Sequence, residues 1–151
     1  NQLNTETTVI LKKASEINTI PANSKVIVGF HKDNSTAYKP YKISDSSKKV
    51  LSDLSKNQTV ILDVFGSPYA LKDIDISKVS TVLVSYENND DAMKATASGL
   101  LGQTKIWGRL PVLVNDNLKF GIGMDVDAKI TTNQTDRKNS SETKNSKTVI
   151  E

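Results

Sequence analysis

Few side chains in this sequence could do chemistry, and most of them stand where apolar runs end. The chain holds one histidine, His31, and no cysteine. Thiolate catalysis, disulfides and multi-histidine metal sites are therefore excluded. A Ser-His-Asp triad would have to use His31 as its base, and no serine lies in an activating context. The sequence also lacks a Gly-rich phosphate loop and a Gly-x-Ser-x-Gly elbow. We expect no catalytic residue, no metal and no cofactor.

Acidic residues offer a weak alternative chemistry. Glycoside cleavage by paired carboxylates needs two acids on either side of a cleft. Asp33 and Glu87 could both reach one edge of the fold, but no pattern in the sequence indicates a cleft between them.

Three apolar runs must position these side chains. Each run is short, rich in β-branched residues and nearly continuous, which is typical of parallel strands buried on both faces. The runs are residues 25–31, 59–65 and 79–86.

Helical patterns lie between and around the runs. Residues 44–55 place Val50, Leu51 and Leu54 on one face, and residues 92–101 follow the capping sequence Asn89-Asp90-Asp91. Residues 3–17 suit either a strand or a helix, and we favour a helix. The alternation predicts an α/β layered domain with a mostly parallel sheet. Residues 109–114 and 118–121 resemble short edge strands.

The carboxyl ends of parallel strands meet at one edge of a sheet, where ligand sites of open α/β folds lie. We call the side chains expected there the strand-end rim, and Gly66 and Pro68 would turn Tyr69 outward onto it. A plainer interpretation has Tyr69 folded back over the sheet and His31 as a solvated strand end. The members of the strand-end rim are His31, Asp33, Ser67, Tyr69, Glu87 and Asn88.

Composition indicates the extent of the domain and the kinds of partner to expect. We assign residues 1–126 to the domain, with residues 1–24 as a helical lead-in, and residues 127–151 to a polar linker or disordered tail. The net charge of +3 comes from lysines scattered among acids, so we expect no nucleic-acid partner. No apolar run is long enough to span a membrane. The chain begins with Asn1 rather than Met, so we expect a processed protein or a piece of a longer one.

Several segments, in the order of the family's motifs, resemble the C-terminal domain of family 3 glycoside hydrolases, most closely the β-N-acetylhexosaminidase-like branch. VILDVFGSPYAL, residues 60–71, is similar to the family's Phe-Gly-Asn-Pro-Tyr-x-Leu strand and turn. VLVSYEN, residues 82–88, resembles the next strand with its Tyr-x-Asn end. The Ala-rich helix 92–102 then closes on Leu-Gly instead of Phe-Gly. The remaining matches are GRLPV at 108–112, similar to Gly-Lys/Arg-Leu-Pro-Val, FGIGM at 120–124, similar to the Gly-x-Gly end, and VIVGFHKDN at 26–34, similar to the preceding strand and loop.

The resemblance covers residues 25–124 and implies a three-layer α/β/α sandwich that packs against a (β/α)8 barrel. In the family the barrel carries the nucleophilic Asp and binds the sugar. Its Lys-His-x-x-Gly motif is absent from this chain. The loop that supplies an acid/base Glu in other branches is residues 31–36 here and has no Glu, with Asp33 a weak substitute. The family's first strand is not visible, so the sandwich could lack it.

Three functions stay open. The first is a non-catalytic C-terminal domain that braces the barrel of the same parent chain, a glycosidase that the resemblance suggests is secreted or periplasmic in a bacterium. Its strand-end rim could also contact glycans that contain N-acetylglucosamine. The second is a free-standing α/β module that binds a sugar or another small ligand through that rim. The third is a subunit interface at the rim.

Overall fold

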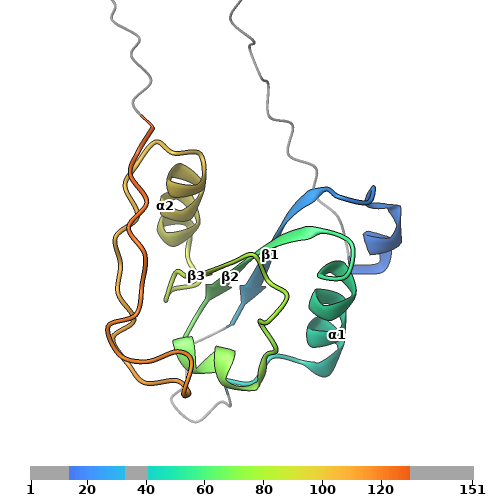
Figure 1. The fold of residues 1–151 in the computed structure, drawn as a ribbon, viewed down its shortest axis with the longest axis horizontal. Helices are drawn as coiled ribbons and strands as arrows, with labels where there is room; N and C mark the ends of the chain where they lie inside the picture. The colour runs from blue at the N-terminus through green and yellow to red at the C-terminus, as the bar shows by residue number, and fades with distance from the viewer. Residues whose placement is uncertain (1–13, 33–40, 130–151) are drawn as a thin grey trace, which may run out of the picture.

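Three parallel strands form the centre of the molecule. The computed structural model describes residues 14–32 and 41–129. Within them β1 (Lys25–His31), β2 (Thr59–Phe65) and β3 (Thr81–Val84) form one sheet in the order β1-β2-β3, and both pairs are parallel (Figure 1). The predicted parallel α/β fold is confirmed. The bounds of β1 and β2 match the apolar runs, whereas β3 is shorter than residues 79–86.

Two α-helices begin at side-chain caps. In α1 (Asp45–Leu54) the hydroxyl of Ser44 accepts a hydrogen bond from the backbone N–H of Ser47. In α2 (Asp90–Leu100) the amide oxygen of Asn89 accepts from the N–H of Ala92 at 2.8 Å. Such acceptors satisfy N–H groups that have no partner inside the helix. Past α2, Gly102 has φ +74°, the left-handed conformation that commonly ends a helix at glycine.

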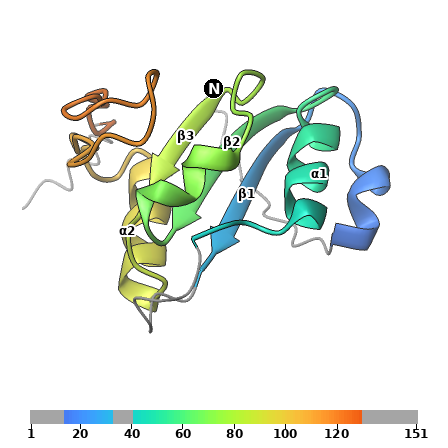
Figure 2. The same ribbon diagram turned by 90° about the horizontal axis from the view of Figure 1, so that it is seen from below.

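Helices cover both faces of the sheet. The even-numbered residues of the strands, such as Val60, Leu62 and Val64, belong to a core that includes Leu51 and Leu54 of α1. The 3₁₀ helix η2 (Pro68–Asp73) adds Ala70 and Leu71 to the same core. On the other face the odd-numbered Asp63 is linked to α2, as described below. Figure 2 shows α1 flanking β1 and α2 flanking β3. The molecule therefore has three layers.

The helix predicted over residues 3–17 is described by the structure only from residue 14 onward. Residues 3–13 of the expected helix lie outside the described residues, as would any additional first strand. Residues 14–19 form a 3₁₀ helix, η1 (Ala14–Thr19), which lies near α1.

Residues 103–129, here named the C-terminal ribbon, fold back on themselves beside α2 (Figure 1). Ile106 and Val126 exchange two backbone hydrogen bonds of 2.9 and 2.7 Å, and Leu110 and Ile122 are joined at 2.8 Å. The predicted strands 109–114 and 118–121 are not strands of the sheet. Pro111 has no N–H to donate, and Gly121, with φ +80°, belongs to a turn, so the pairing stays intermittent. The ribbon continues past residue 126, since the N–H of Lys129 donates to Gly102 at 2.7 Å.

Within residues 14–32 and 41–129, none of the helices has both the length and the apolar character needed to span a membrane.

Candidate functional site

His31 and Asn88 meet at the carboxyl edge of the sheet. The Nδ1 atom of His31 lies 2.8 Å from Oδ1 of Asn88. Because an amide oxygen accepts hydrogen bonds, Nδ1 of His31 is the donor in this pair. The imidazole also stacks on Phe65, its partner in the β1–β2 register, with ring centroids 4.6 Å apart and planes 3° from parallel. Two members of the predicted strand-end rim are therefore in direct contact.

A glycine lets the histidine ring adopt this position. Gly29 stands two residues before His31, on the same side of β1. A Cβ atom at Gly29 would lie 2.9 Å from Nε2 of His31. The ring thus leans back along the strand over the space that a side chain would fill.

The loop after β3 delivers Asn88 to the histidine. Tyr86 has φ +61°, which is uncommon for a bulky residue and turns the chain sharply where β3 ends. The N–H of Glu87 then donates to the carbonyl of Ser85 at 2.6 Å. The side-chain amide of Asn89 donates to Glu87 at 2.6 Å while its oxygen caps α2. The loop between β3 and α2 is thus held by its own side chains.

Ser67 and Tyr69 form a second group. The Ser67 hydroxyl caps η2 and accepts from the N–H of Tyr69 at 3.4 Å. The Tyr69 ring is 42 % exposed and lies 5.9 Å from the ring of Tyr41. Tyr69 is therefore partly exposed, and among the described residues its ring contact is with Tyr41 rather than with His31. Asp33, the remaining member of the strand-end rim, lies outside the described residues.

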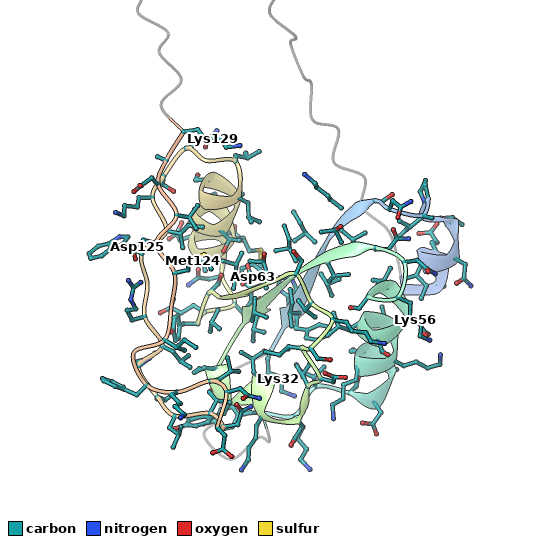
Figure 3. All side chains as sticks on the ribbon, in the orientation of Figure 1. Lys32, Lys56, Asp63, Met124, Asp125 and Lys129 are labelled. Carbon is teal, nitrogen blue, oxygen red and sulfur yellow. The ribbon has the colours of Figure 1, made fainter. Side chains whose placement is uncertain are left out.

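Asp63 is the residue that the sequence reasoning missed. It stands in the middle of β2 and is only 1 % exposed, although it carries an ionisable carboxyl group (Figure 3). The hydroxyl of Ser85 donates to its carboxyl group, with distances of 2.9 and 3.1 Å to the two oxygens, and lies 2.6 Å from the hydroxyl of Thr96 in α2. The signal was present in the run TVILDVF, where one acid interrupts an otherwise apolar buried strand.

Burial raises the pKa of Asp63 above its ordinary value of 3.8. The hydrogen bonds from Ser85 and Thr96, and the nearby charge of His31, oppose that shift. This group links β2 to α2 through Ser85, the residue that follows β3. A carboxyl group sealed in this way has no access to a substrate.

The polar groups of the site bond mainly to one another. Glu87 is held by Asn89, and Asp63 is covered by Ser85. Over the described ranges no cluster of three His, Cys, Asp or Glu side chains is suited to a metal ion. An open depression of about 270 Å³ lies at the opposite edge of the sheet, where β2 begins. It is lined by Ala22, Asn23, Lys56, Asn57, Gln58 and Thr59.

Comparison of the chain with models of known protein families, with curated proteins and with solved structures gives no match. The site must therefore be interpreted from its own geometry and from the sequence motifs.

Proposed function

We propose that this chain is the non-catalytic C-terminal domain of a family 3 glycoside hydrolase of the β-N-acetylglucosaminidase type, and that it braces the catalytic barrel of the same parent chain. The observation that carries the proposal is the agreement between motif order and element order. The segment 60–71 runs through β2 and η2, 82–88 is β3 with its loop, and 92–102 is α2 with its C-terminus. The last two motifs, 108–112 and 120–124, lie opposite each other in the C-terminal ribbon.

Individual motif residues also have structural roles at these positions. Pro68 opens η2 and is buried in the core, which agrees with the Gly-x-Pro-Tyr turn of the family. Tyr86 and Asn88 stand at the end of β3, where the Tyr-x-Asn motif places them. Asn88 there bonds His31 at the end of β1. The contact between His31 and Asn88 therefore gives the motifs at 26–34 and 82–88 a physical reason to occur together.

The state of the described carboxyl groups near this edge favours a bracing role over catalysis. Retaining glycosidases need a nucleophile and an acid/base about 5 Å apart in a cleft. Here Glu87 is engaged by Asn89, and Asp63 is buried. A barrel that supplies both catalytic groups needs from this domain only a rigid supporting surface.

The coding sequence that precedes Asn1 tests the proposal. We expect it to encode a (β/α)8 barrel with a Lys-His loop. A start codon directly before Asn1, or a preceding domain of another fold, would overturn the proposal. In the joined protein, deletion of this domain should lower the thermal midpoint of the barrel by several degrees, because a packed domain interface is lost.

The exposed tyrosine pair favours a second candidate, a module that binds sugar. Tyr41 and Tyr69 present two aromatic rings to solvent, and an aromatic face can stack on a pyranose. Titration with N-acetylglucosamine, followed by NMR, tests it. Binding that Tyr69→Ala abolishes and Trp107→Ala preserves would support the module. A spectrum unchanged at millimolar sugar would refute it and leave the bracing role.

A further inference from the structure

The outer edge of β1 has no strand beside it in the part of the chain that the structure describes. The sheet order is β1-β2-β3, so β1 is paired on one side only. Edge strands of natural proteins are usually short, or they carry charged residues, proline or a bulge that hinders pairing with other strands. β1 extends over seven residues, and between Lys25 and His31 it contains only apolar residues and Gly29. This composition is typical of an interior strand rather than of an edge strand.

The backbone hydrogen bonds of β1 show which of its groups face the outer edge. The N–H of Lys32, one residue past the strand, donates to the carbonyl of Phe65 in β2 at 3.0 Å. Because the N–H and C=O groups of successive residues alternate in direction along a strand, the even-numbered residues of β1 turn theirs to β2. Ile27 and Gly29 therefore turn theirs to the outer edge. These are the groups with which an added strand would pair.

Apolar surface lies beside this edge as well. Ile27 stands at the centre of β1, yet it is 57 % exposed. Helix α2, which covers the same face of the sheet, flanks β3 rather than β1 (Figure 2). Neighbouring strands bring side chains on one face into contact. An added strand with large apolar side chains would thus gain hydrogen bonds from the edge and apolar contact with Ile27.

The position of η1 shows from which segment such a strand can come. Ile17 of η1 and Ile20 just after it pack against the core that contains Leu51 and Leu54 of α1, so η1 lies on the same face of the sheet as α1. The connections from β1 to β2 and from β2 to β3 also cross this face, through α1 and η2. Crossovers between parallel strands are right-handed in about 98 % of cases. A parallel strand that precedes η1 must therefore lie on the side of β1 opposite to β2, which is the outer edge.

The sequence before η1 contains one run that is suited to a strand. Residues 7–11, which lie outside the described residues, read TTVIL. Threonine, valine and isoleucine are enriched in strands because their branched side chains fit a pleated surface. Residues 12–24 would connect this run to β1, and parallel strands need a connection of about a dozen residues or more. The run thus has both the composition and the distance along the chain that the outer edge of β1 requires.

The other terminal segment is less suited to this edge. Residues 130–151 begin on the β3 side of the sheet, because the N–H of Lys129 donates to the carbonyl of Gly102 just past α2 (Figure 1). They repeat the tripeptide Thr-Val-Ile of residues 8–10 at 148–150, but residues 131–147 between Ile130 and that repeat are all polar. The right-handed crossover rule favours only the segment before η1.

We propose that residues 7–11 dock as a strand on the outer edge of β1, parallel to it, and add a fourth strand to the sheet. The proposal replaces the helix expected for that part of residues 3–17, and it does not rest on the proposed function. The docked segment covers Ile27 and occupies an edge on which other chains could otherwise pair.

Amide hydrogen exchange in the full chain, followed by NMR, tests the proposal. In the wild type the N–H groups of Ile27 and Gly29 should exchange at least about 100-fold more slowly than in an unstructured peptide, because the docked strand accepts their hydrogen bonds. The N–H of Val28 faces β2 and is the internal reference. Cross-strand nuclear Overhauser effects should also join Gly29 to residues 7–11.

A pair of matched variants identifies the segment that docks. Val9→Pro, Ile10→Pro removes two N–H groups from the run, and proline is poorly tolerated within paired strands. Exchange at the outer-edge amides 27 and 29 should become at least about tenfold faster, while that at 28 stays slow. Val149→Pro, Ile150→Pro makes the same changes in the repeated tripeptide and should leave all three rates unchanged.

Each other result would overturn the proposal. Fast exchange at amides 27 and 29 in the wild type would show that the outer edge is not paired. Protection that only the variant at 149 and 150 removes would assign the edge to the C-terminal segment, and protection that falls on dilution would assign it to a second copy. Protection that neither variant alters would exclude residues 7–11. If the variant at 9 and 10 does not fold, the Overhauser effects in the wild type decide, and their absence refutes the docking.

Discussion

At the scale of single residues, Asp63 combines near-complete burial with an ionisable group. Its two oxygens accept from one hydroxyl, that of Ser85, which also contacts Thr96. Removing a buried hydrogen-bond partner generally costs more than the bond itself contributes, because the remaining polar group is left desolvated. Asp63 therefore holds β2, β3 and α2 together only as long as all three groups are present.

We expect the effect of Asp63→Asn on stability to depend on pH. Burial raises the pKa of Asp63 above 3.8, so the folded state holds a proton that the unfolded state releases. The unfolding free energy of the wild type should therefore fall as pH rises from 3.8 through the raised pKa. The side-chain amide of the variant cannot titrate. The unfolding free energy of the variant relative to that of the wild type should therefore increase across that pH window and stay constant at higher pH. Urea unfolding of both proteins between about pH 3 and pH 7 measures this difference.

Carboxyl groups with a lowered pKa change the unfolding free energy with pH in the opposite direction. Their contributions are the same in both proteins and cancel in the difference between them. The lysines at positions 49 and 56 lower the pKa of Asp53 to about 2, and Arg109 lowers the pKa of Asp125. Their contributions are lost as pH falls below 3.8, in both proteins alike. A constant difference between wild type and variant at every pH would contradict the assignment to Asp63.

Removing the carboxyl group of Asp63 should lower the unfolding free energy more than replacing it with a neutral amide. Asp63→Ala removes the acceptor of the part-buried Ser85 hydroxyl and leaves a gap in the core, so we expect a loss of about 1–3 kcal/mol in unfolding free energy at neutral pH. Asp63→Asn keeps an acceptor oxygen and the side-chain volume and is the matched control. Chemical denaturation followed by circular dichroism gives both values. Equal values for the two variants would show that the hydrogen bonds contribute little.

At the scale of elements, the N-terminus of α2 depends on a single side chain. Asn89→Ala removes the acceptor for the N–H of Ala92 and should cost about 1 kcal/mol of unfolding free energy. Asn88→Ala is the control, since the neighbouring amide bonds His31 at an exposed position and caps no helix. We expect its cost to be within about 0.5 kcal/mol. Urea titration compares the two, and equal costs would argue against the cap.

The C-terminal ribbon should tolerate a side chain at one glycine and not at another. A Cβ atom at Gly123 would collide with the backbone carbonyl of Gly108, whereas a Cβ atom at Gly108 meets nothing within 4 Å. We expect Gly123→Ala to cost about 1–3 kcal/mol, because backbone must shift to admit the methyl group. Amide hydrogen exchange at Ile106 and Val126 reports on the ribbon directly. Faster exchange should occur in Gly123→Ala and not in Gly108→Ala.

The sequence predicted best the elements whose type and ends are specified by neighbouring residues. Continuous β-branched runs define β1 and β2, and Asn89 and Gly102 mark the two ends of α2. The third run failed at its edges, because the left-handed backbone of Tyr86 ends the strand early. The ribbon failed more broadly, since its pairing depends on contacts such as Gly123 against Gly108 that no periodicity reveals.

At the scale of the whole molecule, the sequence indicated that His31 and Asn88 lie at one edge of the sheet, but it did not indicate that they pair. Parallel order alone places His31 and Asn88 at the same edge. Their contact depends on Gly29 and Phe65, which position the ring from neighbouring strands. Tyr69, at the same edge, contacts Tyr41 because η2 begins at Pro68 and turns the chain. Such choices are settled by packing between distant segments, which spacing in one sequence does not encode.

The carboxyl groups described at the strand-end rim lead to a prediction for the isolated chain. We expect that residues 1–151 do not hydrolyse a chromogenic N-acetyl-β-glucosaminide. Retaining hydrolysis requires two carboxyl groups that both reach the scissile bond. Asp63 is buried beneath Ser85 and α2, and Glu87 is bonded to Asn89, so the described part of the chain offers no such pair at the rim. We expect wild type and Glu87→Gln to release chromophore at the rate of buffer alone, in an assay that a known β-N-acetylhexosaminidase validates. Turnover by the wild type that Glu87→Gln abolishes would make Glu87 catalytic and would replace the bracing role with an active site in this domain.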